Sequence, residues 1–243
     1  MKDHLLDIVA HTHGLEVFEM VKIVGSEDST SLTAIGKDNS VVLEAKFIGV
    51  IPEFVGTFGM PNLSKLNTLL NIPEYANDAT ITMGQQEKDG KKIPSEINFE
   101  NKTGDFKNTY RLMSANVLDS RLSNIKFNGA NWNVELEPAE AAIQKFRFQS
   151  TANSEFTNFT AKSEGDALKF YFGDHSSHSG NFIFANGVKG KLKRSLSWPK
   201  DIFVKVLSLP GDKLIKFSDD GASMITVNSG LAIYNYIVVA QVK

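Results

Sequence analysis

Short runs of apolar residues recur along most of the chain, and in many of them polar residues occupy every second position. They lie at residues 41–47, 97–100, 168–172, 214–217 and 234–239. Turn-forming sequences separate these runs, with Asp-Gly or Gly-Asp steps at 89–90, 165–166 and 220–221. Glycine tolerates the positive φ angles of tight hairpin turns. The pattern therefore predicts antiparallel sheet.

Four segments instead place apolar residues three and four positions apart, which is the period of an amphipathic helix. They run from residue 2 to about 13, from 61 to 72, from 138 to about 148, and from 199 to 209. In the second segment, four leucines share one face and polar residues share the other. Three of the segments open on proline, which we expect at the first helical position because its missing N–H costs nothing there.

The helical segments are spaced as two copies of one plan. The first two begin about 59 residues apart and the last two about 61 apart, with offsets of about 136 and 138 between the copies. The prolines that open and close the second and fourth helices repeat with offsets of 138 and 137. We therefore predict an α+β protein with two similar domains, each of antiparallel sheets with two short helices packed on one face. The predicted limits are 1–118 and 133–243, with a connector at 119–132.

Composition excludes several classes of protein. The 243 residues are 42% apolar and 22% charged, as in ordinary globular domains. No apolar stretch reaches the roughly 18 residues that a membrane span needs, and we expect no secretory signal. The absence of cysteine excludes disulfides, thiolate catalysis and zinc sites built on cysteine. These features fit a cytoplasmic protein.

The net charge of −2 is unevenly distributed. Residues 1–118 carry 11 basic and 16 acidic side chains, whereas residues 119–243 carry 15 and 12. Much of the basic excess falls in one stretch, where a single acid, Asp201, accompanies Lys189, Lys191, Lys193, Arg194, Lys200 and Lys205. A cluster of this kind either serves solubility or meets phosphate groups.

No catalytic or cofactor motif is present. The sequence has no phosphate-binding loop, dinucleotide fingerprint or nucleophile elbow. His11 and His13 stand two apart on a predicted helix and so point in different directions. His175 and His178 lie in a Gly/Ser-rich loop beside Asp174, which fits either solvated histidines or a metal site. We expect no enzymatic activity, no cofactor and no metal.

The C-terminal quarter carries a family resemblance. The helical segment 202–209 is followed by Pro210-Gly211-Asp212-Lys213-Leu214, and the closing strand reads Tyr234-Asn235-Tyr236-Ile237-Val238-Val239-Ala240. This order resembles the C-terminal part of the bacteriophage sliding clamps, the PCNA-like DNA polymerase processivity factors of T-even-type phages. The N-terminal helix and the leucine-rich helix after Pro61 occupy corresponding places, so the resemblance covers the chain in outline.

The resemblance implies a function without catalysis. Clamp subunits form a closed ring, here a homotrimer, that encircles double-stranded DNA without reading its sequence and tethers the replicative DNA polymerase. An ATP-dependent clamp loader places the ring, in the cytoplasm of an infected bacterial host. The alternative is a phage tail or baseplate protein with two β-rich domains. A third hypothesis is a small-molecule or carbohydrate-binding protein with a site near Trp132 or Trp198.

The resemblance also implies three sets of site residues. The helix side chains that would face DNA are Lys2, Lys65, Asn67, Asn71, Gln144, Lys145, Arg147, Lys200 and Lys205. Edge strands at 106–113 and 180–186, which could also be internal strands, would form the subunit interface through Phe106, Tyr110, Leu112, Phe182 and Phe184. The groove that binds partner peptides would use Val117, Leu118, Leu122, Ile125, Pro210, Tyr236 and Val238.

Overall fold

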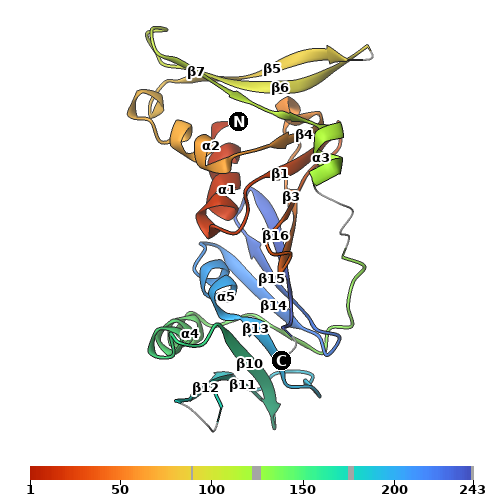
Figure 1. Ribbon diagram of the computed structural model, residues 1–243, viewed down its shortest axis with the longest axis vertical. Coiled ribbons are helices and arrows are strands. Elements are labelled where there is room, and N and C mark those ends of the chain that lie inside the picture. The colour runs from red at the N-terminus through yellow and green to blue at the C-terminus, as the bar shows by residue number, and fades with distance from the viewer. Residues whose placement is uncertain (89, 122–126, 175–177, 242–243) are drawn as a thin grey trace. The chain divides into compact units, whose positions relative to one another are not determined.

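The structure, a computed structural model, describes residues 1–88, 90–121, 127–174 and 178–241 (Figure 1). It is an α+β protein with antiparallel sheets and few short helices, as predicted. The chain divides into two compact units. Unit 1 comprises Met1–Lys126 and Ser229–Tyr234, and unit 2 comprises Phe127–Asn228 and Asn235–Lys243. The predicted limits of the domains and connector stay a prediction.

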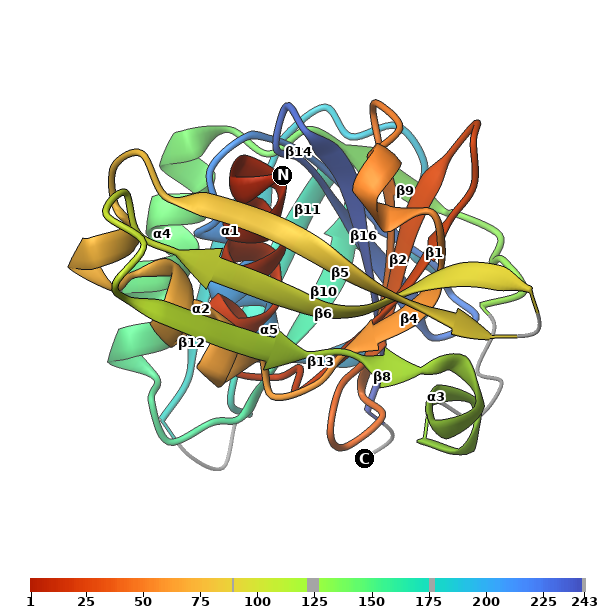
Figure 2. The ribbon, with the colours of Figure 1, turned by 90° about the horizontal axis from the view of Figure 1, so that it is seen from above.

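Unit 1 holds two antiparallel sheets and a pair of helices. Its elements are α1 (Lys2–His11), β1 (Val21–Gly25), β2 (Thr30–Ile35), β3 (Val41–Phe47), β4 (Gly56–Met60), α2 (Leu63–Leu70), β5 (Thr80–Lys88), β6 (Lys91–Glu100), β7 (Lys107–Arg111), β8 (Met113–Ser114) and α3 (Ala115–Arg121). One sheet has the order β8-β4-β1-β2-β3 and the other β5-β6-β7. The β5-β6-β7 sheet lies over the pair α1 and α2 (Figure 2).

Unit 2 repeats this design. Its elements are β9 (Val134–Leu136), α4 (Glu140–Ala152), β10 (Asn158–Glu164), β11 (Ala167–Phe172), β12 (Gly180–Ala185), β13 (Leu196–Pro199), α5 (Lys200–Leu207), β14 (Asp212–Phe217), β15 (Ala222–Asn228) and most of β16 (Ala232–Val239). One sheet has the order β12-β11-β10-β13, and in the other β14 lies between β9 and β15.

The two-fold repeat predicted from the spacing of the helices is confirmed. From α1 to β7 and from α4 to β16, the chain runs helix, four strands, helix, three strands. The pairings also correspond, because β1 pairs with β2 and β4, and β10 pairs with β11 and β13. The helices α1 and α4 begin 138 residues apart, and α2 and α5 begin 137 apart. By this correspondence β12 is the counterpart of β3, and β16 is the counterpart of β7.

The helix starts differ from the sequence prediction. Helix α2 begins at Leu63, and the side chain of Asn62 caps it by accepting a hydrogen bond from the Lys65 N–H at 3.2 Å. Pro199 is the N-cap residue of α5, and Pro138 lies two residues before α4. The assignment of these prolines to the first helical position was therefore wrong. An N-cap or preceding residue contributes no N–H to the helix, so proline is equally harmless there.

Helix α3 is an element that the sequence analysis missed. Its Leu118 side chain is fully buried and covers Gly59 on β4. A Cβ atom at position 59 would lie 2.5 Å from Leu118 Cδ2, so only glycine lets the helix pack this closely. With seven residues, α3 is too short for its period to stand out in the sequence.

Phenylalanines form the centre of unit 2, as their positions in strand patterns predicted. Phe170 is fully buried, and its ring centroid lies 4.3 Å from that of Phe184 and 4.6 Å from that of Phe159. Phe146 on α4 contacts the same cluster at 5.6 Å from Phe170. Stacked and edge-on rings at these separations add to the free energy gained by burying them.

Replacing Phe170 by alanine should lower the free energy of unfolding by about 3–5 kcal/mol, because it leaves a cavity that the surrounding rings cannot fill. Denaturant unfolding measures the change. Phe148→Ala is the matched control, since that ring is 71% exposed, and it should change stability by less than about 0.5 kcal/mol. Equal losses in the two variants would contradict the described core.

Candidate functional site

The outward face of α2 is polar and carries one cation. Lys65 is exposed, and among the described residues no carboxylate pairs with it. Asn67 and Asn71, one turn apart, are joined by a hydrogen bond of 2.9 Å from Asn71 Nδ2 to Asn67 Oδ1. Lys2 differs, because its ammonium donates to the carbonyl oxygens of Tyr75 at 2.6 Å and Ala76 at 2.8 Å. It fastens the start of α1 to the segment that follows α2.

The outward face of α4 carries two further cations. Lys145 and Arg147 are exposed, and in the described part of the chain neither is paired with a carboxylate. Gln144 donates a hydrogen bond of 3.0 Å to the carboxylate of Glu140, one turn earlier. On α5, Lys205 is half-buried. These helix faces thus combine cations with amides and hydroxyls, which are the groups that contact phosphates and sugars.

Lys200 has to be removed from the predicted DNA-facing set. Only 5% of the residue is exposed. Its ammonium donates to the carbonyl oxygens of Ser150 at 3.2 Å and Asn153 at 3.1 Å, at the C-terminal end of α4. Carbonyl groups at a helix C-terminus lack partners within the helix and attract positive charge. The side chain therefore ties α5 to α4 inside unit 2 and is unavailable to DNA.

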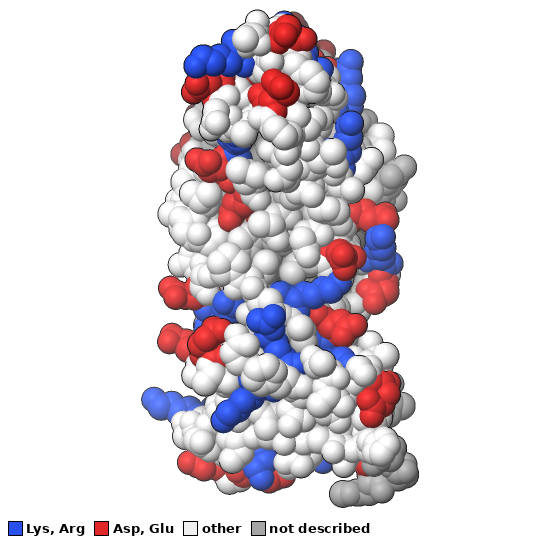
Figure 3. Space-filling view, turned by 90° about the vertical axis from the view of Figure 1, so that its left-hand side faces the viewer, with Lys and Arg blue, Asp and Glu red and all other residues white. Residues whose placement is uncertain are grey.

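Figure 3 is viewed from the side on which the helices of unit 2 stand in Figure 1. Over α4 and α5, Lys and Arg side chains gather in a band with carboxylates at its margins. The surface over α1 and α2 is mostly uncharged, with scattered carboxylates. The cations of the helix face are therefore concentrated on unit 2, in keeping with the basic excess of the second half of the sequence.

Both predicted edge strands are edges. Strand β7 is the outer strand of β5-β6-β7, and β12 is the outer strand of β12-β11-β10-β13. Each leaves one row of backbone N–H and C=O groups without a strand partner among the described residues. On β7 the outward side chains Lys107 and Arg111 are paired with Glu100 and Glu96 of β6. On β12 the large apolar side chain of Ile183 is 43% exposed.

The side chains predicted for the subunit interface divide into two kinds. Tyr110 and Phe184 are each 3% exposed and belong to the cores of their units. Tyr110 donates a hydrogen bond to the carbonyl of Pro61, and burial raises the pKa of its phenol. Phe106 is 39% exposed, and Leu112 and Phe182 are half-buried. The last three, with the strand edges, remain the candidates for contact with another chain.

The residues predicted for the peptide-binding groove differ in their exposure to solvent. Val117 is 44% exposed and Pro210 is exposed, whereas Leu118, Tyr236 and Val238 are fully buried. Leu122 and Ile125 lie outside the described residues. The three buried side chains belong to the packed framework of the strands and of α3, and Val117 and Pro210 are the exposed members of the predicted set among the described residues.

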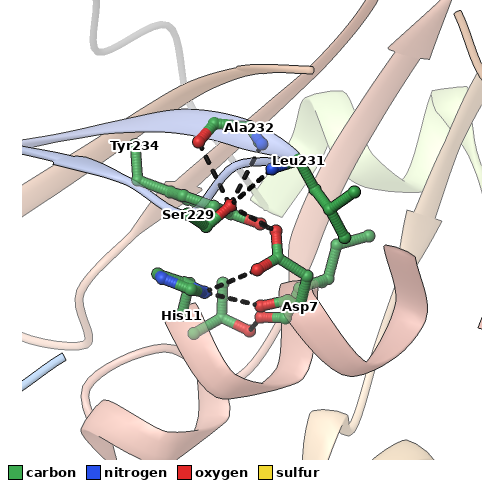
Figure 4. A network of polar contacts seen from close by, with 8 residues as sticks. Asp7, His11, Ser229, Leu231, Ala232 and Tyr234 are labelled. Carbon is green, nitrogen blue, oxygen red and sulfur yellow. Dashed lines mark hydrogen bonds and ion pairs between the residues drawn. The ribbon is translucent and has the colours of Figure 1, made fainter. Parts of the chain in front are cut away.

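A buried polar network at α1 was missed by the sequence analysis (Figure 4). The carboxylate of Asp7 accepts hydrogen bonds from the hydroxyls of Tyr234 at 2.7 Å and Ser229 at 3.0 Å. Nδ1 of His11 lies 3.2 Å from the same carboxylate, and the imidazole stacks on the Tyr234 ring at 4.2 Å. The network fastens the turn before β16 to α1 within unit 1. Asp7 and His11 are four apart in sequence, but no local sequence pattern indicates their partners Ser229 and Tyr234, which lie more than 220 residues away.

Among the described residues, the structure gives no support for a metal site or for a binding site at Trp198. No group of three or more His, Asp or Glu side chains there is arranged to hold a metal ion. No described helix is long and apolar enough to cross a membrane. His175 lies outside the described residues, and Trp198 is fully buried against Phe217 at 4.9 Å.

Comparison with solved structures identifies the fold. A structure of PCNA from A. fulgidus with the C-terminal region of FEN-1 bound matches with a TM-score of 0.70 and 10% identity, over 100% of this chain and 96% of that one. PCNA from Thermococcus kodakaraensis matches with a TM-score of 0.67 and 11% identity, over 99% and 97%. The chain has the PCNA clamp fold. No family model and no curated protein matches the sequence.

Replacing Asp7 by asparagine should destabilise this clamp-fold protein at neutral pH by about 1–3 kcal/mol, because charge-assisted hydrogen bonds to buried groups are lost. Burial raises the pKa of Asp7, but hydrogen bonds from His11, Tyr234 and Ser229 outweigh it and hold the pKa below its usual value. This contribution is therefore present above about pH 4 and is lost as pH falls through the lowered pKa.

Denaturant unfolding as a function of pH measures both effects. The native protein should lose stability on acidification more steeply than Asp7→Asn, and the two curves should converge at low pH. A constant difference between the curves down to the lowest pH would contradict the assigned role of the ionised carboxylate.

Proposed function

We propose that this protein is a sliding clamp, a non-catalytic ring that encircles double-stranded DNA and tethers the replicative DNA polymerase. The observation that carries the proposal is the pair of free edges, β7 and β12, in a chain built from two similar units. The polar and basic faces of the helices and the PCNA clamp fold also support the proposal. The proposal includes no active site and no cofactor.

The repeat itself suggests how copies of the chain would join. In the larger sheet of unit 1, β3 is bordered by β16, whose residues Ala232–Tyr234 belong to that unit. Strand β12 is the counterpart of β3, and β7 is the counterpart of β16, yet β12 and β7 are not paired with each other among the described residues. Pairing β12 of one copy with β7 of the next would repeat the same neighbour relation. Such a head-to-tail contact is heterologous and generates a ring when the rotation closes.

The helix faces fit a ring that slides. Lys65, Lys145 and Arg147 are exposed cations without carboxylate partners among the described residues. Contacts to phosphate carry no sequence information, and flexible cations exchange one phosphate for the next. Asn67, Asn71 and Gln144 add hydrogen-bonding groups. We assign these six residues to the DNA-facing surface, together with Lys205.

The partners follow from the resemblance of the sequence to phage clamps and from the neighbouring fold. A solved structure of PCNA has the C-terminal region of FEN-1 bound. We propose that this chain likewise accepts a peptide, from its polymerase, near Val117 and Pro210. An ATP-dependent loader, a homotrimeric ring and a phage-infected bacterial cytoplasm complete the proposal.

Assembly should depend on the β12 edge. Ile183→Asp places a charge on an edge strand that the proposal buries against β7 of the next copy, so the assembled mass should fall towards that of one chain. Light scattering across a concentration series measures it. Val24→Asp is the control, because Val24 is 42% exposed but lies on β1, which is paired on both sides. Equal dissociation of both variants, or a single-chain mass for the native protein, would count against the ring.

Primer extension on a long template, with the cognate polymerase and loader, tests the function. Adding the protein should lengthen the products, and the variant Lys65→Gln, Lys145→Gln, Arg147→Gln should shorten them again while its assembled mass is unchanged. Products of the same length with and without the native protein would overturn the clamp function and favour a structural role in the virion.

A further inference from the structure

A second group of cations lies away from the helix faces. The loop between β12 and β13 exposes four basic side chains within six residues: Lys189, Lys191, Lys193 and Arg194. In the described chain none of the three lysines is paired with a carboxylate, whereas Lys37, Lys102 and Lys107 elsewhere on the surface each are. We call residues 189–194 the basic loop.

The backbone of the basic loop is held in place at several points. The carboxylate of Asp219 accepts hydrogen bonds from the N–H groups of Lys193 at 3.0 Å and Arg194 at 2.9 Å. The N–H of Leu192 donates to Ser163 Oγ at 2.9 Å, and its side chain is only 7% exposed. The backbone of the basic loop is therefore anchored, while its lysine side chains are exposed to solvent.

The anchoring also sets which way the side chains face. Gly190 forms a bridge with Val134, and a Cβ atom there would lie 2.0 Å from the Asn133 carbonyl oxygen. Positions 190 and 192 thus face the body of unit 2, and the lysines at the alternate positions stand outside. Lys189, Lys191 and Lys193 are all exposed within five residues of one anchored loop, and we call these three charges the row.

The nearby carboxylates do not neutralise this row. Asp219 is occupied by the two backbone N–H groups, and Asp220 accepts a hydrogen bond from the Asn131 N–H at 3.3 Å. Arg194 and Lys162 also line a cavity of about 600 Å³, but Asp174 and Asp220 line it too, so the charges of its lining balance. The exposed row itself is where an anion would meet cations without opposing charge.

The basic loop does not belong to the helix face. Strand β10 begins beside Pro199, just before α5, and ends at Glu164 next to the loop anchor Ser163. Asp219 follows β14, whose first residue Asp212 comes after α5. The loop therefore lies at the ends of these strands farthest from the start of α5, and in unit 2 of Figure 1 the helices stand to the left and the turn after β14 to the right.

We propose that the basic loop binds the phosphate backbone of DNA at a site separate from the helix face. A row of lysines on a fixed backbone suits a polyanion, and each contact releases a counterion. Specific protein partners usually need a buried apolar or aromatic anchor, and the one apolar side chain of the loop, Leu192, is turned inwards. The site requires only a single chain and stands whether or not the protein supports a polymerase.

The test compares two triple variants with equal loss of charge. Lys189→Gln, Lys191→Gln, Lys193→Gln removes the row. The control, Lys37→Gln, Lys102→Gln, Lys216→Gln, removes three lysines that are already paired with carboxylates and lie outside the proposed interface. Dissociation constants for a short duplex and for a single strand are measured over a salt series. The loop variant should reduce the slope of log K against log salt by up to about 2.7 for a duplex or about 2.1 for a single strand, at about 0.9 or 0.7 per lost phosphate contact.

The form of DNA whose slope falls by close to its own expected value is the form that the loop contacts, and the control variant should leave both slopes nearly unchanged. A charge-keeping variant with arginine at the three loop positions should retain the native slope. Equal slopes for the native protein and the loop variant would overturn the proposal. So would a loop variant with native DNA binding but weakened binding to polymerase or loader, since that result assigns the row to an acidic protein surface.

Discussion

Hydrogen bonding along the edges of sheets is the constraint on which the proposed assembly depends. A strand inside a sheet satisfies its backbone groups on both sides, but in the part of the chain that the structure describes β7 and β12 each have a strand partner on one side only. Exposed edges of this kind invite pairing with any extended chain. The two-fold repeat gives the edges complementary places, since they correspond to the neighbours β16 and β3. In the proposed ring, pairing β7 with β12 of the next copy would satisfy these two edges and close the ring around a hole.

Lysine side chains serve three different purposes in this chain, and the partner of each ammonium group distinguishes them. The ammonium group of Lys2 donates hydrogen bonds to backbone carbonyl oxygens in the segment after α2. That of Lys200 donates to backbone carbonyl oxygens at the C-terminal end of α4. Several surface lysines, such as Lys107, pair with carboxylates on an adjacent strand. Other exposed cations, among them Lys65 on α2 and the three lysines of the basic loop, have no carboxylate partner among the described residues. A count of charges along the sequence cannot distinguish these purposes, because each depends on groups that are distant in the chain.

Much of the fold was predictable from local pattern. The leucines of α2, the phenylalanines of unit 2 and the spacing of the helices gave the two-fold α+β architecture, because periodicity reports directly on which face is buried. Turn chemistry identified hairpins, and both edge strands were placed correctly. Helix α3 was missed because its packing depends on the absence of a side chain at Gly59, which no hydrophobic pattern records.

The candidate site was less predictable for the same reason. Lys200 follows a proline at the start of a helix and looks exposed, yet the carbonyl groups that bind it come from α4, some 50 residues earlier. Tyr236 and Val238 read equally well as groove or core, and they are core. The network around Asp7 joins residues from opposite ends of the chain. The role of a side chain that depends on residues distant in sequence can be assigned only from the structure.

Topological retention on DNA tests the central claim most directly. The protein is placed on a nicked circular duplex by its loader, freed of unbound protein, and followed by gel filtration before and after the circle is cut once. A closed sliding ring predicts that the protein stays with the circle through a wash in high salt and leaves when the DNA becomes linear. Loss from the intact circle in high salt, or equal retention on circular and linear DNA, would contradict encirclement.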